Sequence, residues 1–122
     1  MSSAINWFEI PAADFARAKK FYSTIMDGEL PEMEMGGFMM AFFPADNTGV
    51  GGAIVSGEGC VPSDKGSLIY LNGGDDLNTV LSRVEDAGGK VIMPKTAIGN
   101  DYGYCAIFTD SEGNRMGLHS MS

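Results

Sequence analysis

The fold is decided by the stretch DFARAKKFYSTIMDG, residues 14–28, and by a stretch of the same pattern 62 residues later. Asp14 is a good N-cap, Gly28 suits the C-terminal end, and apolar residues recur between them at the spacing of one helix face: Phe15, Ala18, Tyr22 and Ile25. The second stretch has Asp75 or Asp76 as its cap, Gly88-Gly89 at its end, and the inner stripe Leu77, Val80, Leu81 and Val84. We therefore predict helices over 14–26 and 76–87.

Strand-like segments surround both helices in the same order. One precedes each helix, at 5–10 and 67–72; three follow each, at 30–35, 37–43 and 50–55, then at 90–95, 102–109 and 114–121. Beyond the helices the shift becomes 65, which places Phe43 on Phe108 and Gly52 on Gly117. The order β-α-β-β-β, written twice, predicts an α+β protein. Its two modules, about 1–56 and 67–122, would be joined by a linker over 57–66 within one domain of 1–122.

Composition excludes several classes of partner. The chain has 122 residues and a net charge of -8, which disfavours nucleic acid because phosphate backbones are repelled. No apolar run has the length of a membrane span, and residues 1–6 hold neither a basic stretch nor a signal-peptide core. Cys60 and Cys105 form no CxxC pair. We expect two free thiols in a cytoplasmic protein that contacts neither nucleic acid nor membrane.

Four segments resemble one known family. They are NWFEIP at 6–11, DFARAKKFY at 14–22, VEDAGGKV at 84–91 and FTDSEGNR at 108–115. They are similar to the glyoxalase/bleomycin-resistance/dioxygenase group, the vicinal oxygen chelate superfamily. The resemblance implies two βαβββ modules whose mixed sheets curl around one cleft, commonly in a homodimer.

The resemblance also implies where metal-dependent members carry their ligands. The matching positions are Trp7, Gly52, Ile69 and Gly117, none of which has a side chain that binds a divalent ion. A slip of one residue to Ala53 and Leu118 supplies no donor either. His119 is the only histidine, so a triad of two histidines and one carboxylate is impossible within one chain. We therefore expect no metal and no other cofactor.

Strand alternation predicts the lining of the cleft, if Trp7 faces it as the resemblance implies. Residues 5 and 9 of the first strand then share the face of Trp7. In the other strands the residues on this face are 50, 52 and 54, then 69 and 71, then 115, 117 and 119. Tyr102 is added because the loop 95–103 either closes over the cleft mouth or is a surface connection. The expected ligand-binding residues are Trp7, Glu9, Gly52, Ile69, Leu71, Tyr102, Arg115, Gly117 and His119.

Glu9 is the candidate catalytic residue. Among apolar neighbours its carboxylate would have a raised pKa and act as a general base; alternatively it is a structural carboxylate paired with Arg115 or a lysine.

Three functions remain open at this level. The first is a metal-free protein that binds a small, largely apolar molecule between the modules. The second is a lyase, isomerase or dioxygenase-type enzyme of the same superfamily that uses Glu9 or an unrecognised metal site. The third is a structural or regulatory dimer.

Overall fold

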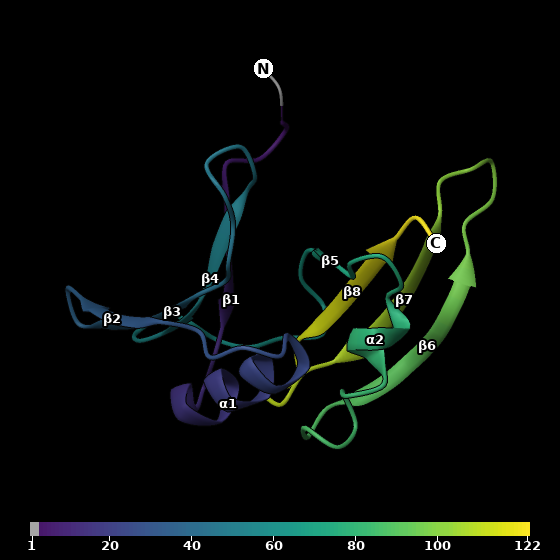
Figure 1. Ribbon diagram of the computed structural model, residues 1–122. Helices are drawn as coiled ribbons and strands as arrows, with labels where there is room; N and C mark the ends of the chain where they lie inside the picture. Colours follow the sequence, from purple (N-terminus) through teal and green to yellow (C-terminus); the bar gives the residue numbers. More distant parts are fainter. Residues whose placement is uncertain (1–2) are drawn as a thin grey trace.

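The computed structural model describes residues 3–122 (Figure 1). Met1 and Ser2, which belong to the stretch inspected for a signal peptide, lie outside the described residues. The elements in chain order are β1 (Trp7–Pro11), α1 (Phe15–Ile25), β2 (Glu32–Met35), β3 (Phe38–Phe42), β4 (Gly51–Ser56), β5 (Tyr70–Asn72), α2 (Asn78–Leu81), β6 (Lys90–Ala97), β7 (Tyr104–Thr109) and β8 (Arg115–Ser120). Within residues 3–122, neither helix has the length and apolarity that a bilayer crossing demands.

The strands form two sheets of the same topology. Their strand orders are β1-β4-β3-β2 and β5-β8-β7-β6. In each sheet the first and last strands of the module run parallel, whereas the other pairs are antiparallel. The predicted α+β class with two βαβββ modules and mixed sheets is therefore confirmed.

Helix α1 begins as the sequence indicates but ends differently. The Asp14 carboxylate accepts the Arg17 N–H at 3.1 Å, so the predicted N-cap is correct. At the other end the Gly28 N–H donates to the Ser23 carbonyl and the Asp27 N–H to that of Thr24, which is a Schellman motif. The left-handed residue is Asp27, with φ of 56°, and not the expected Gly28. Aspartate tolerates this conformation because its short side chain bonds locally.

The second predicted helix is shorter than expected. Only Asn78–Leu81 is α-helical, although residues 76–87 were expected to be. Beyond Ser82 most backbone bonds are i→i−3, as from Arg83 to Val80 and from Val84 to Leu81, so the segment continues as tight turns. Its apolar stripe is nevertheless buried as predicted.

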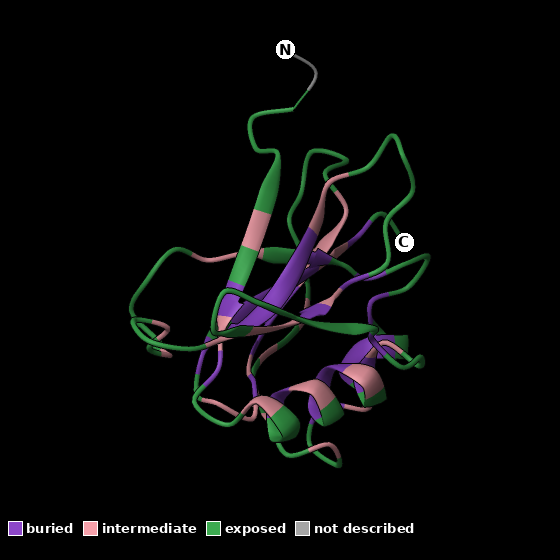
Figure 2. Ribbon diagram, turned by 90° about the vertical axis from the view of Figure 1, so that its left-hand side faces the viewer, coloured by how far each residue is buried: buried purple, intermediate pink, exposed green. Residues whose placement is uncertain are grey.

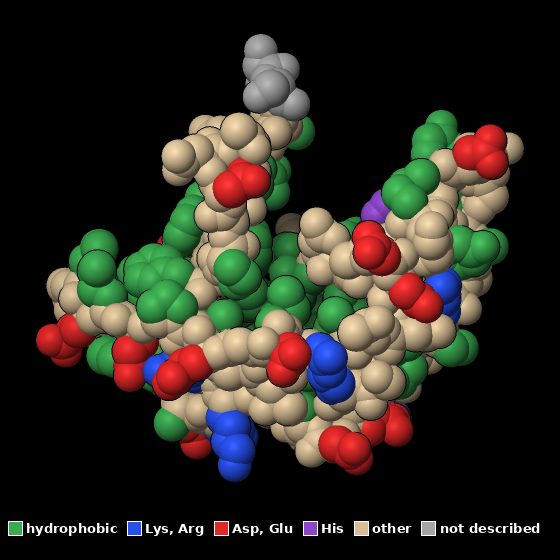
Figure 3. Space-filling model, viewed as in Figure 1, with side chains coloured by type: hydrophobic (Ala, Val, Ile, Leu, Met, Phe, Trp, Pro, Cys, Tyr) green, Lys and Arg blue, Asp and Glu red, His purple; other side chains and the backbone are tan. Residues whose placement is uncertain are grey.

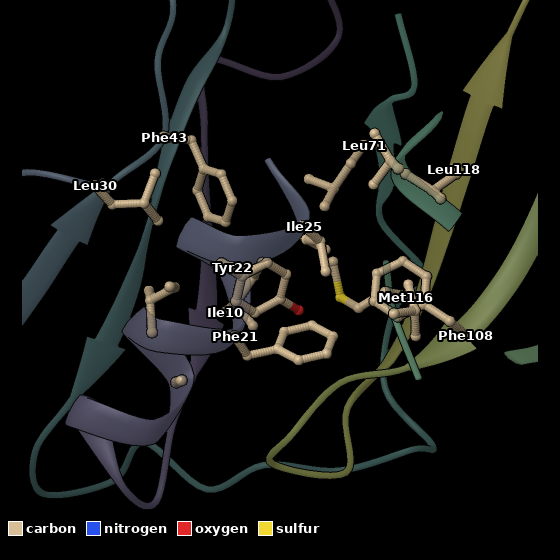
Figure 4. Packing of buried hydrophobic residues seen from close by; sticks show 14 of the residues in the cluster. Ile10, Phe21, Tyr22, Ile25, Leu30, Phe43, Leu71, Phe108, Met116 and Leu118 are labelled. Atoms are coloured by element: carbon tan, nitrogen blue, oxygen red, sulfur yellow. The ribbon is translucent and has the colours of Figure 1, made fainter. Parts of the chain in front are cut away.

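The core lies between the modules, and α1 is at its centre. Figure 4 shows α1 side chains between Phe43 of the first module and a group from the second that includes Met116, Phe108 and Leu118. The Phe21 ring is 6.1 Å from that of Phe108 and 4.9 Å from that of Tyr22. Helix α1 packs against both sheets and not only its own, because its stripe is widened by Phe21.

The turn DSEGN, residues 110–114, fastens the second module to the start of α1. Glu112 Oε1 accepts the backbone N–H groups of Ala13 and Asp14 at 3.0 and 2.7 Å, and Arg17 Nε donates to Oε2 at 2.6 Å. The side chain of Glu112 is fully buried. Asn114 Nδ2 donates to the Pro11 carbonyl at 2.8 Å. A carboxylate at the N-terminus of a helix is stabilised by the unpaired N–H groups there.

This contact makes stability depend on pH. Burial opposes ionisation of Glu112, but hydrogen bonds from Arg17 and Asp14 outweigh it and hold its pKa below the ordinary 4.5. A depressed carboxyl pKa contributes stability that is complete above the unfolded pKa and is lost as pH falls through the folded pKa. We therefore expect the free energy of unfolding in urea to decrease as the pH falls below about 4.5.

In Glu112→Gln the free energy of unfolding should decrease less steeply as the pH falls. In Glu34→Gln, where an exposed strand residue is changed, it should decrease as steeply as in the wild type. Equal slopes in all three proteins would contradict this contribution of Glu112.

Candidate functional site

A hollow of about 510 Å³ lies between β1 and β5. Figure 3 shows hydrophobic side chains gathered at the base of the opening between the two arms of the molecule. None of the described residues that line this hollow is charged. They are Ile5, Trp7, Phe8, Met26, Phe43, Pro44, Val50, Ser67, Leu68, Ile69, Tyr70, Leu71 and Asn72. A concave, largely apolar site of this size suits a small molecule.

Each module places an exposed aromatic ring over a glycine of its parallel neighbour strand. A Cβ built on Gly51 would lie 3.2 Å from the Trp7 ring, and one built on Gly117 would lie 2.5 Å from that of Tyr70. The two rings are 43% and 51% exposed, and both line the hollow. Figure 2 shows the exposed, green start of β1 standing clear of the purple core. The glycines allow the rings to lie flat, and two aromatic walls result.

A second, smaller hollow of about 220 Å³ adds charged groups. It is lined by both Glu9 and Arg115, and Ser67 and Ile69 line both hollows. Trp7 Nε1 donates to Glu9 Oε2 at 3.2 Å, so the indole of one hollow is bonded to the carboxylate of the other. Within residues 3–122 no ion pair involves Glu9 or Arg115. Glu9 is exposed, and within the described residues it has no lysine partner.

Two strand phases differ from the prediction. Gly52 pairs with Phe8, and Ile54 of the same strand lies in the core, so Gly52 is on the core face. The residue of β4 that shares the face of Glu9 is Ala53. Leu71 is also a core residue and is only 5% exposed, although it borders the hollow.

Tyr70 is an aromatic wall of the hollow that the prediction missed. It lines the hollow together with the expected Leu71, and it pairs with Gly117. Ile69, predicted for the cleft, packs against the core and borders both hollows. The signal that pointed to Tyr70 was the glycine of β8, since a strand glycine often marks a close approach.

His119 lies outside these two hollows. It lines a third one of about 580 Å³ with Tyr70 and Asn72, and its Nε2–H donates to the Tyr102 carbonyl at 2.7 Å. The Tyr102 side chain is 64% exposed at the tip of the β6–β7 connection. Cys105 stands opposite His119 in the strand register and is half-buried. The structure thus groups Tyr102 with His119 and separates both from Glu9.

The donor set does not suit the metal that the fold family implies. With the corrected phases, the residues that the register puts at the expected ligand positions are Trp7, Ala53, Tyr70 and Gly117, which include no imidazole, thiolate or carboxylate. Among the residues that the structure describes, no three His, Cys, Asp or Glu side chains come together. A zinc site needs at least three such ligands.

Comparison with known proteins decides the family. The model of the Glyoxalase/Bleomycin resistance protein/Dioxygenase superfamily matches residues 4–118. The chain belongs to this superfamily. A "Glyoxylase-like domain-containing protein" from Didymella fabae is 31% identical over 120 residues, which cover 90% of this chain and 88% of that protein.

Solved structures of the superfamily share the fold. TnmS3, described as an antibiotic binding protein from Streptomyces sp. CB03234, superposes with a TM-score of 0.69 at 22% identity, over 100% of this chain and 99% of that one. Glyoxalase I from Zea mays superposes with a TM-score of 0.68 at 18% identity, over 95% of this chain and 44% of that one. At these identities the superpositions establish the fold alone.

Proposed function

We propose that this superfamily member binds a small, largely apolar aromatic molecule in the cleft between its modules, without a metal. The observation that carries the proposal is the apolar hollow walled by Trp7 and Tyr70, with no charged lining residue. Exposed aromatic rings on a rigid sheet stack well on planar ligands. The similarity of the fold to that of TnmS3, an antibiotic binding protein, supports the same proposal.

An enzymatic role for Glu9 has less support. Its carboxylate is exposed and accepts a hydrogen bond from the Trp7 indole, and within the described residues no second acid, base or nucleophile hydrogen-bonds to it. The absence of donor side chains at the expected ligand positions weighs against metal-dependent chemistry. Binding without chemistry is therefore the simpler function for this cleft.

The test uses the only tryptophan as its reporter. Titration with a planar aromatic compound such as acridone should quench Trp7 fluorescence with saturation at one compound per cleft. Metal analysis of the purified protein should find less than stoichiometric zinc or nickel. Absence of saturable quenching would contradict the binding function, and stoichiometric metal held by cleft side chains would contradict the metal-free claim.

We also propose that the protein works as a homodimer in the reducing cytoplasm, with residues 1–122 acting as one domain. On the face of the first sheet opposite α1, strands β2 and β3 carry three exposed apolar side chains: Met33, Met35 and Phe38. Patches of this kind mark association surfaces. The two unpaired cysteines support the location, and the shared core supports the single domain.

Solution scattering should accordingly give a particle of twice 12.9 kDa at micromolar concentration. Met35→Glu should shift that particle toward the monomer, because a charge would be placed on the apolar face. Lys20→Glu, on the exposed side of α1, is the matched control and should leave the dimer intact. A wild-type particle of 12.9 kDa would contradict the homodimer.

A further inference from the structure

We infer that the ligand of this cleft carries a zwitterionic head group beside its aromatic ring, with an ammonium toward Glu9 and a carboxylate toward Arg115. The inference rests on the proposed function, because the ring is the part held by Trp7 and Tyr70. It adds the chemical class of the other end of the ligand.

Glu9 is the only charged side chain on its face of the first sheet. The register places Trp7 and Glu9 of β1 on one face with Ala53 of β4 and Phe42 of β3, followed by Met40 and Met33. The acidic residues of β2 lie on the opposite face, where Glu32 is 3.3 Å from Lys19. None of the described residues on this face is a lysine or arginine, so the carboxylate is free to pair with a cationic group of a ligand.

Arg115 provides the complementary charge. It lies on β8 next to the buried Met116, and its side chain makes no ion pair or hydrogen bond within residues 3–122. Glu9 and Arg115 line the same hollow of about 220 Å³ and yet do not pair within 4.0 Å. Two opposite charges that share a hollow without touching leave room for a group that bridges them.

The spacing matches a single molecule. Trp7 and Glu9 are two residues apart on one strand face, which is about 7 Å. Ser67 and Ile69 line both hollows, so the ring site and the charged site are neighbours. Trp7 Nε1 donates a hydrogen bond to Glu9 Oε2, whereas no described residue donates to Glu9 Oε1. An ammonium can therefore bind Oε1 while the indole still holds the carboxylate in place.

Charge balance selects the zwitterion over its singly charged relatives. The chain carries a net charge of -8, which disfavours a purely anionic ligand, and Arg115 disfavours a purely cationic one. A carboxylate and a guanidinium form the strongest geometry when they bond through two parallel hydrogen bonds. The predicted class is an aromatic α-amino acid or a compound that presents the same head group.

The experiment compares four probes that share one ring: L-tryptophan, tryptamine, indole-3-propanoate and 3-ethylindole. Calorimetric titration of the full chain should give L-tryptophan at least tenfold tighter binding than 3-ethylindole. Glu9→Gln should abolish the advantage of the ammonium in tryptamine, and Arg115→Gln the advantage of the carboxylate in indole-3-propanoate. Glu58→Gln, which changes the net charge as Glu9→Gln does but lies outside the cleft, should retain all four affinities. Both cleft residues are exposed, so their variants are expected to fold.

The outcomes separate the two proposals. Equal affinity for 3-ethylindole and L-tryptophan would overturn the zwitterionic head group and leave aromatic binding standing. Failure of every indole together with acridone would overturn aromatic binding itself, and the head group with it. Unchanged probe preferences in Glu9→Gln and Arg115→Gln would likewise overturn the assignment of the two charges.

Discussion

Asp110→Asn is expected to reduce the free energy of unfolding by about 3–5 kcal/mol, although the two side chains have nearly the same shape. Asp110 is 4% exposed and its carboxylate accepts four hydrogen bonds. Oδ2 accepts from Tyr22 Oη at 2.6 Å and Asn114 Nδ2 at 3.0 Å, and Oδ1 accepts the backbone N–H groups of Glu112 and Asn114, each at 2.9 Å. An amide would turn its NH₂ group toward two of these donors.

Urea unfolding followed by circular dichroism measures the effect. Asp86→Asn, at an exposed position after α2, removes the same charge and should cost less than 0.5 kcal/mol, as surface substitutions do. Tyr22→Phe deletes only one of the four bonds and should cost about 1–2 kcal/mol, which keeps the test possible if Asp110→Asn does not fold. A loss below about 1 kcal/mol in Asp110→Asn would show that the buried carboxylate is replaceable.

The physical reason for this cost is that one turn holds both modules together. Burial and the Asp110 carboxylate raise the pKa of Tyr22 well above its ordinary value, so the phenol stays protonated and donates. Asn114 Oδ1 accepts the Ser63 N–H at 3.0 Å, which ties the connecting segment to the same point. The turn that marks the superfamily in the sequence is thus a structural contact, and its Asn114 also borders the smaller hollow.

The helices and their buried stripes were predictable because periodicity identifies a helix face without ambiguity. Each stripe lies among polar neighbours, such as Arg17 and Lys20 in α1, so only one phase of the pattern is possible. The length of α2 was not predictable in the same way. Its bond pattern changes from i→i−4 to i→i−3 while the same side chains remain buried.

The strands show where alternation stops being informative. In β8 the polar Arg115 and His119 alternate with the buried Met116 and Leu118, so the two polar residues share one face of the strand. In β4 the run GGAIVS is small or apolar on both faces, so nothing in it distinguishes Gly52 from Ala53. The run Ile69-Tyr70-Leu71 is equally uniform. A slip of one residue moves every side chain to the other face, and for this reason the prediction missed Tyr70, although the predicted Leu71 also borders the hollow.

Trp7→Ala should cause the largest loss of ligand binding, about thirtyfold for an aromatic compound such as acridone. The indole is one of two aromatic walls, and stacking on one ring contributes about 2 kcal/mol. It also orients Glu9 through the 3.2 Å hydrogen bond, so its removal releases the carboxylate as well. Calorimetry is the appropriate measurement, because the variant retains no tryptophan.

Tyr102→Ala is the matched control for that experiment, since it removes an aromatic ring that is 64% exposed and lines none of the hollows described above. It should change acridone affinity less than twofold. If Tyr102→Ala weakened binding as much as Trp7→Ala, the loop 95–103 would have to close over the cleft in the complex. If neither variant weakened binding, the aromatic ligand would have to occupy another surface. The pair of variants therefore separates two ways of holding the aromatic ring of the ligand. One is stacking on Trp7 of β1, and the other is closure of the loop that carries Tyr102, whose carbonyl accepts a hydrogen bond from His119.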